Sequence, residues 1–238
     1  MKPKGMTLIE SLISLSLFLL ILMAAFEFFG LTRAMFVKLR DASEEAQAAA
    51  AAQDKIRIDL MRAGLGLVPP IRLGLIEAVT ADSDGLTIRR AERTKALEED
   101  LAEGQTSLKA GFIDGAKKGI ELCFYDALKG EIREIAGIEG TIPILSSPLA
   151  YSYSKESAWV IAVEKIDVFL DQEDRIVRRR VDSGSAQPLV ENVKAFACSF
   201  DKARNLASVS FVLASRSGKE KTHELWMYPK NAGLSAER

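Results

Sequence analysis

Residues 6–31 read MTLIESLISLSLFLLILMAAFEFFGL, and this stretch decides how the chain is built. No charged residue occurs between Ser11 and Phe26, and Glu27 is the one charge between there and Leu31. As a helix the stretch would be roughly 39 Å long, enough to cross a bilayer whose hydrocarbon core is about 30 Å thick. The sequence therefore predicts a membrane-spanning helix next to the N-terminus.

The helical pattern continues past this stretch. Apolar positions recur at alternating spacings of four and three, with a single polar interruption, while charged residues, Asp59 among them, occupy the other faces. Gly64 and Gly66 favour the end of a helix, and the two prolines that follow them prevent its continuation. We expect one helix from about Met6 to Ala63, roughly 87 Å long, whose second half packs on a head domain; a coiled coil between protomers is the alternative. The stripe comprises Leu31, Met35, Leu39, Ala42, Ala46, Ala49, Gln53, Ile56, Leu60 and Ala63.

After the prolines the pattern changes to short strands, and the absence of alternating strand and helix predicts an antiparallel sheet and an α+β fold. A change of parity near Glu164 and Lys165 indicates a bulge. Residues 92–109 are expected as a short helix or a loop, and 140–154 as an irregular connection. The expected strands are 74–80, 86–91, 119–126, 131–136, 158–170, 175–181, 189–200, 207–215 and 222–228.

The composition argues against several classes of protein. With 32 Lys+Arg against 33 Asp+Glu, the chain lacks the basic surplus of a nucleic-acid binder. One histidine, His223, excludes His-rich metal sites, and two cysteines exclude a disulfide scaffold or a four-thiolate zinc site. No nucleotide-binding, zinc or nucleophile-elbow motif is present. We therefore expect no catalytic residues, no metal and no cofactor.

Two general explanations of the N-terminus leave features unexplained. A cleaved signal peptide, with Lys2 and Lys4 at its start and cleavage after Ala25, conflicts with the length of the apolar run and with Met23 at the cleavage site. An ordinary signal anchor accounts for the two lysines on the cytoplasmic side. It does not account for Glu10, because a carboxylate at the edge of a lipid-facing helix is costly unless it is paired.

Residues 4–10, KGMTLIE, closely resemble the N-terminal signal of prepilins and type II secretion pseudopilins. The resemblance implies that prepilin peptidase cleaves after Gly5 and methylates the new N-terminal amine of Met6. Most members have Phe where this chain has Met6, although methionine also occurs there. Glu10, at the fifth mature position, would pair with the amine of a neighbouring subunit and so set its register. The alternative is that Glu10 only caps the start of the helix.

Weaker resemblances occur later in the chain. Residues 59–64, DLMRAG, are similar to the end of the helix in large W-type minor pilins. Residues 188–193, PLVENV, followed by Phe196, are similar to the last third of W-type minor pilins and of J-type minor pseudopilins. Together the resemblances imply a leader at 1–5, a transmembrane and fibre-core helix at 6–31, an amphipathic helix at 32–66 and a β-rich head at 67–238.

The implied function is structural. A minor pilin would wait in the inner membrane with its head in the periplasm, then join other minor and major pilins at a fibre tip, driven by an assembly ATPase and an inner-membrane platform. A minor pseudopilin of a type II secretion system is the close alternative, and the residues 62–64 favour the pilus. A single-pass sensory or ligand-binding protein, or an enzyme on a signal anchor, is a more distant alternative.

Several head residues have two interpretations. Asp82-x-Asp84-Gly85 could form part of a calcium loop, but it lacks the further acidic ligand and is an ordinary hairpin turn. Cys123 and Cys198 could form a disulfide in the periplasm, although their parity relative to neighbouring apolar residues places them on opposite faces of a sheet.

The other candidates are basic and aromatic. Residues 178–180, three arginines, could contact DNA, but we expect a hairpin strand whose outward residues are solvated, with Val177 and Val181 pointing inward. Trp159, Trp226 and Tyr228 are expected in the core or at subunit contacts.

Overall fold

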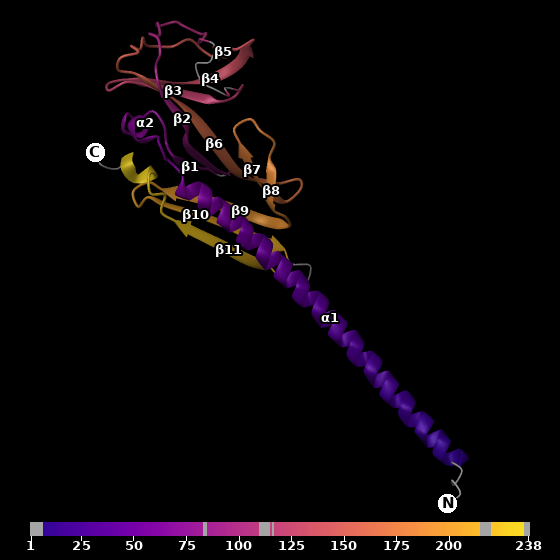
Figure 1. Ribbon diagram of the computed structural model, residues 1–238. Helices are drawn as coiled ribbons and strands as arrows, with labels where there is room; N and C mark the ends of the chain where they lie inside the picture. The colour runs from indigo at the N-terminus through magenta and orange to yellow at the C-terminus, as the bar shows by residue number, and fades with distance from the viewer. Residues whose placement is uncertain (1–6, 83–84, 110–114, 116, 215–219, 236–238) are drawn as a thin grey trace, which may run out of the picture. The chain divides into compact units, whose positions relative to one another are not determined.

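Helix α1 (Leu8–Met61) confirms the prediction of one long helix (Figure 1). It ends where Gly64 and Gly66 take positive φ angles of 73° and 75°, a conformation that glycine adopts without a Cβ penalty. The prolines then form the short helix α2 (Val68–Arg72), in which they occupy the first turn, where a missing N–H has no cost.

The computed structural model describes residues 7–82, 85–109, 115, 117–214 and 220–235. The chain divides into two compact units, Met1–Gln47 and Ala48–Arg238. Apart from Thr7, the described part of the first unit is all α1. The second unit contains the end of α1, α2, the strands and the short 3₁₀ helix η1 (Ala232–Ser235).

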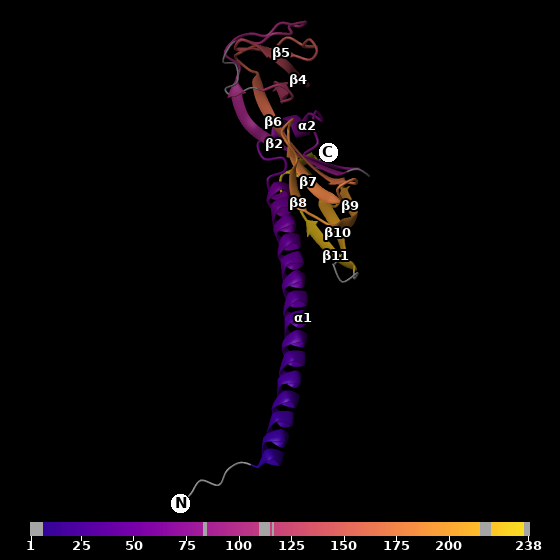
Figure 2. The ribbon, with the colours of Figure 1, turned by 90° about the vertical axis from the view of Figure 1, so that its right-hand side faces the viewer.

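The strands form two sheets in which all described pairs are antiparallel, as predicted. The first has the order β1-β2-β6-β3-β4-β5, with β7 paired to β6 and β8 paired to β7. The second has the order β11-β10-β9. Within the second unit, β4 and β5 lie at one end and β9, β10 and β11 at the other (Figures 1 and 2). Their bounds are β1 (Val79–Ala81), β2 (Gly85–Ala96), β3 (Glu121–Tyr125), β4 (Gly130–Glu139), β5 (Ile142–Leu145), β6 (Trp159–Asp171), β7 (Ile176–Val181), β8 (Gln187–Val190), β9 (Val193–Asp201), β10 (Leu206–Ala214) and β11 (Glu220–Met227).

Three segments differ in extent from what the sequence predicts. The strand expected at 189–200 is divided at Asn192, whose φ of 59° breaks the extended backbone, so that β8 and β9 belong to different sheets. Of the short helix or loop expected at 92–109, the loop is found at residues 97–109, because β2 continues to Ala96. The connection at 140–154 contains β5, which pairs with β4.

The change of parity in β6 has a different cause from the one expected. The register shift lies in the partner strand β2, between Ala91 and Arg93. One edge of β6 pairs with β3 up to Val163 and with β7 from Ile166 onward. Glu164 and Lys165 lie between the two partners. Residues 160–163 of β6 are buried on both faces, so the pattern of apolar residues there does not by itself indicate a bulge in β6.

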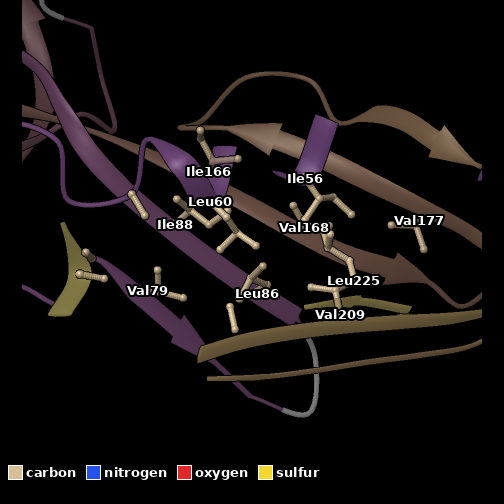
Figure 3. Packing of buried hydrophobic residues seen from close by; sticks show 14 of the residues in the cluster. Ile56, Leu60, Val79, Leu86, Ile88, Ile166, Val168, Val177, Val209 and Leu225 are labelled. Atoms are coloured by element: carbon tan, nitrogen blue, oxygen red, sulfur yellow. The ribbon is translucent and has the colours of Figure 1, made fainter. Parts of the chain in front are cut away.

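The larger apolar cluster joins the end of α1 to both sheets. From Ala49 onward the predicted stripe is buried except at half-buried Gln53, and Ile56 and Leu60 are fully enclosed. Ile56 points toward Val168 of β6 and Leu225 of β11 (Figure 3). Because burying an aliphatic side chain of this size contributes about 1.5–3 kcal/mol, these two residues fix the last turns of α1 to the head.

A second apolar cluster lies on the other side of β3. It takes Leu97, Leu101 and Leu108 from the segment without regular structure, together with Phe124 and Tyr153, whose ring centroids are 6.1 Å apart. Leu101 also forms an isolated bridge with Tyr153. The loose spacing of the three leucines thus reflects a covering segment, and not a helix.

Candidate functional site

The start of α1 contains a capping box built from two side chains. The backbone N–H and the hydroxyl of Thr7 donate to Oε2 of Glu10 at 2.9 and 3.1 Å, and the N–H of Glu10 donates to Oγ1 of Thr7 at 3.3 Å. Glu10 is exposed. Glu10 therefore caps the start of α1 within a single chain. Gly5 and Met6, the predicted cleavage and methylation positions, lie outside the described residues.

The helix that follows is apolar on all sides and uncovered by the rest of the described chain. Its large apolar side chains between Leu8 and Leu39 are all exposed, from 38% at Leu22 to 83% at Leu8. Its most apolar 18 residues have a mean hydropathy of 2.4. Such a helix is long and apolar enough to span a membrane. The predicted membrane-spanning helix is confirmed to this extent.

Two hydroxyl groups inside this segment, those of Ser16 and Thr32, are satisfied within the helix. Ser16 donates to the carbonyl of Leu12, and Thr32 donates to the carbonyl of Phe28, both at 2.8 Å. A hydroxyl bonded to the carbonyl four residues earlier needs no partner from its surroundings. These polar residues are therefore compatible with lipid or with an apolar fibre core.

Further along, α1 carries two polar contacts to the head. Gln53, the interruption in the apolar stripe, donates from Nε2 to the carbonyl of Glu224 in β11 at 2.9 Å. Asp59 is buried and accepts hydrogen bonds from Nε and Nη2 of Arg179 at 2.6 and 3.1 Å. This bidentate ion pair joins α1 to β7 across 120 residues of sequence.

Arg179 lies on the inward side of β7 with Val177, and its side chain is only 9% exposed. Its neighbours also have acidic partners in the chain. Arg178 pairs with Asp171 at 2.7 Å and with Asp174, and Arg180 pairs with Asp167 at 3.0 Å. The three arginines are thus neutralised by the chain's own carboxylates, which argues against a DNA contact here.

Cys123 and Cys198 are free thiols, so the possible disulfide is not formed. Burial raises the pKa of Cys123 to about 12 and that of Cys198 to about 11. Cys198 lies in β9 of the smaller sheet, where its Sγ donates to the carbonyl of Asp82 at 3.6 Å. The parity argument against a disulfide reached the right outcome from a wrong premise. Both faces of β3 are buried, with Leu122 and Phe124 in the second cluster, and Cys123 lies in the first cluster, against which Cys198 also packs.

The calcium-loop and histidine candidates have structural roles among the described residues. Oδ1 of Asp82 accepts the N–H of Gly85 at 2.8 Å and so closes the hairpin between β1 and β2, while Asp84 lies outside the described residues. The described residues contain no group of three or more His, Cys, Asp or Glu side chains arranged to hold a metal ion. His223 stacks on Phe211 at 5.4 Å, and burial, with a smaller effect of Lys221, lowers its pKa below the usual range.

A groove of about 410 Å³ lies beside β2 and β6. Its polar groups contact one another: Thr87 donates to Oδ1 of Asp167 at 2.8 Å, and Lys165 and Arg180 pair with the same carboxylate at 3.6 and 3.0 Å. The groove is therefore neutral, and its central carboxylate is already satisfied.

The aromatic residues singled out from the sequence are exposed, by 45% at Trp159, 62% at Trp226 and 65% at Tyr228. They are not core residues. The expected core position is therefore wrong for all three, and a role at subunit contacts stays a prediction.

Comparison of the chain with family models, with curated proteins and with solved structures found no match. The structure itself therefore carries the functional argument. It is an α+β chain with an exposed apolar N-terminal helix, an acidic capping residue in the first turn of that helix, and two antiparallel sheets.

Proposed function

We propose that the chain is a minor pilin, a structural subunit that primes or caps assembly of a type IV pilus after processing by prepilin peptidase. The observation that carries the proposal is Glu10, an acidic residue in the first turn of an exposed apolar helix, five positions after Gly5. A carboxylate at this place is costly in a lipid-facing helix and useful in a fibre.

In this proposal Glu10 has one partner in its own chain and a second partner in the neighbouring subunit. Thr7 contacts Oε2 only, and Oε1 has no partner among the described residues. Cleavage after Gly5 would create a positive amine on Met6 of each subunit. Oε1 of one subunit would then accept a hydrogen bond from the amine of the next, and this charge-assisted bond would set the register of the two helices.

The rest of the chain would supply anchoring and contacts. The segment from Leu8 to Leu31 would hold the precursor in the inner membrane and then form part of the fibre core. The head would lie in the periplasm and contact sister heads, for which exposed Trp226 and Tyr228 are suitable residues. Prepilin peptidase, other pilins and the inner-membrane assembly platform would be the partners.

Mass spectrometry of the N-terminal peptide from the native membrane fraction tests the proposal. A peptide that begins at methylated Met6 supports it. A start at Met1 would leave a plain single-pass anchor, and a start at Phe26 would indicate a secreted protein; each contradicts it. As a functional test, Glu10→Ala should abolish incorporation into fibres and retain membrane insertion. The matched control is Glu27→Ala, which removes a second exposed carboxylate from the same helix.

A minor pseudopilin of a type II secretion system would have the same N-terminal processing. The neighbouring genes distinguish the two machines, because each is encoded with different partners.

A further inference from the structure

The end of α1 has a second apolar face. Ile56 and Leu60 are buried against the sheets, whereas Ile58 is 44% exposed and Met61 is 49% exposed. At about 100° per residue, Ile58 points roughly opposite to Ile56. A helix that is apolar on two opposite sides is normally covered on both.

The exposed face continues into the turn after the helix. Leu65 is 54% exposed, and its backbone is held in place because its carbonyl accepts the N–H of Ala91 at 2.8 Å. We define Ile58, Met61 and Leu65 as the outward stripe. Its backbone is fixed by the packing of Ile56 and Leu60 beneath it.

Positive charge predominates beside the outward stripe. Lys55, Arg57 and Arg62 are exposed, and Arg57 is paired with Asp54 at 2.8 Å. The only other carboxylate between residues 54 and 65 is Asp59, which is buried against Arg179. A partner surface that fits here is therefore apolar at its centre and acidic at its margins.

This charge pattern disfavours a symmetric pair of copies of the chain. Two copies anchored in one membrane leave it in the same direction. In a two-fold pair their helices would place Arg62 beside Arg62 and Lys55 beside Lys55. Like charges at such short separation oppose association, so a different protein fits better than a second copy.

The size of the outward stripe indicates how the partner is held. Residues 55–65 span roughly 16 Å, so the contact covers a few hundred Å² at most, well below the approximately 800 Å² per partner of a stable complex. A second attachment must supply the remaining affinity. A partner with its own helix in the same membrane has this attachment and a high effective concentration.

We infer that the outward stripe binds a different membrane-anchored protein through an apolar face flanked by aspartate or glutamate. The inference rests on the proposed function, because it specifies the chemistry of the sister subunit that lies beside this helix. It concerns the part of α1 next to the head, and not the pairing of Glu10.

Photo-crosslinking of the full-length chain in native cells tests the inference. With Ile58→p-benzoylphenylalanine, illumination should produce an adduct with another membrane protein, and the cross-linked peptide should contain Asp or Glu within one helical turn of an apolar contact. The matched position is Leu128, which is 90% exposed elsewhere on the head and should not produce this adduct.

Charge reversal separates the apolar from the electrostatic contribution to partner binding. K55E/R62E should lower the yield of the Ile58 adduct on the order of tenfold, since two attractive pairs become repulsive. K117E/K118E reverses two other exposed lysines and should leave the yield unchanged. An adduct formed only between copies of the chain, a partner without acidic residues, insensitivity to K55E/R62E, or no adduct would each overturn the inference.

The N-terminal peptide from the same membranes distinguishes the two proposals. A methylated Met6 without a heteromeric adduct at Ile58 overturns the inference alone. A start at Met1 together with the expected adduct overturns the pilin proposal and retains the acidic, membrane-anchored partner.

Discussion

Arg179 of β7 and Asp59 of α1 form a bidentate ion pair that is almost completely removed from solvent, with side-chain exposures of 9% and 2%. A buried ion pair contributes little to net stability compared with apolar residues of the same size, but the removal of one partner leaves an uncompensated buried charge. The pair therefore fixes the position of α1 on the head more than it stabilises the head.

We expect Asp59→Asn to lower the free energy of unfolding by about 3–5 kcal/mol, because the guanidinium of Arg179 would remain buried without its counter-charge. Asp54→Asn, which breaks the exposed pair with Arg57, should cost less than about 1 kcal/mol. Asp59→Leu combined with Arg179→Met should recover most of the loss. Urea unfolding of the full chain in detergent, followed by circular dichroism, measures all three. Equal costs for the Asp59 and Asp54 variants would contradict the assignment.

Gly66→Ala should be more costly than Gly74→Ala. Both glycines have a positive φ, 75° and 71°, so alanine pays a similar backbone penalty of about 1 kcal/mol at each. A Cβ on Gly66 would lie 2.7 Å from the Cβ of Ala91, whereas a Cβ on Gly74 would meet nothing within 4 Å. We expect a further loss of about 1–3 kcal/mol at Gly66, measured by the same unfolding assay. Equal losses would show that the turn relaxes away from β2.

The pKa of Asp182 is raised above its ordinary value of 3.8, mainly by burial and further by nearby Glu164, Glu92 and Glu121, although the N–H of Lys165 donates to it. A carboxyl group whose pKa is higher in the folded than in the unfolded state stabilises the fold most when the pH is below its unfolded-state pKa. This stabilisation is lost as the pH rises through its folded-state pKa. Asp182→Asn should therefore be more stable than the wild type at pH 7.

The gain from Asp182→Asn should grow as the pH rises through the range in which carboxyl groups ionise, and it should disappear below about pH 4. Asparagine also tolerates the φ of 48° at this position. Unfolding curves between about pH 3.5 and 8 provide the measurement, because this interval covers the range in which carboxyl groups titrate. A gain that does not change with pH would exclude titration of Asp182 as its cause.

Both cysteines should react slowly with iodoacetamide in the folded chain. The thiolate is the reactive form, and burial keeps the pKa of Cys123 near 12 and that of Cys198 near 11. Of the two, half-buried Cys198 should react first, and both should react fully after denaturation. Intact-mass analysis counts the added groups. A mass lower by two hydrogens and no labelling after denaturation would instead indicate a disulfide.

Local patterns were sufficient for much of the fold. The apolar run from Met6 and the four-and-three spacing after it together predicted α1 to within two residues at each end, and turn residues located the hairpins of β1 with β2 and of β3 with β4. They could not show that residues 189–200 divide between two sheets. That division depends on Asn192 and on which partners the two halves meet, and neither is encoded in the alternation of apolar residues.

The contact between Asp59 and Arg179 was missed, although a signal was present. Arg179 has the same strand parity as Val177 and Val181, the residues expected to point inward, and Asp59 precedes Leu60 at the edge of the buried stripe. A charge at an inward position requires a partner. Local sequence could have identified the two inward charges, but their pairing across 120 residues depends on the tertiary fold.

The site was predictable in part. The apolar helix followed from composition alone, and the Thr-x-x-Glu spacing is that of a capping box. Gln53 was treated as a defect in the stripe, whereas its amide satisfies a carbonyl at the edge of β11. The outward stripe could not be distinguished from the rest of α1, because period alone does not tell which of two apolar faces the head covers.

The central position of β6 in the larger sheet has a consequence for folding during synthesis. β2 and β3 both pair with β6 and not with each other, although they precede it in the chain. A chain that is synthesised from its N-terminus must hold both strands with open edges until residues 159–171 have been made. During that interval β2 and β3 are the strands most exposed to mispairing with other nascent chains. The nascent head is thus most in need of a chaperone just before Trp159 emerges.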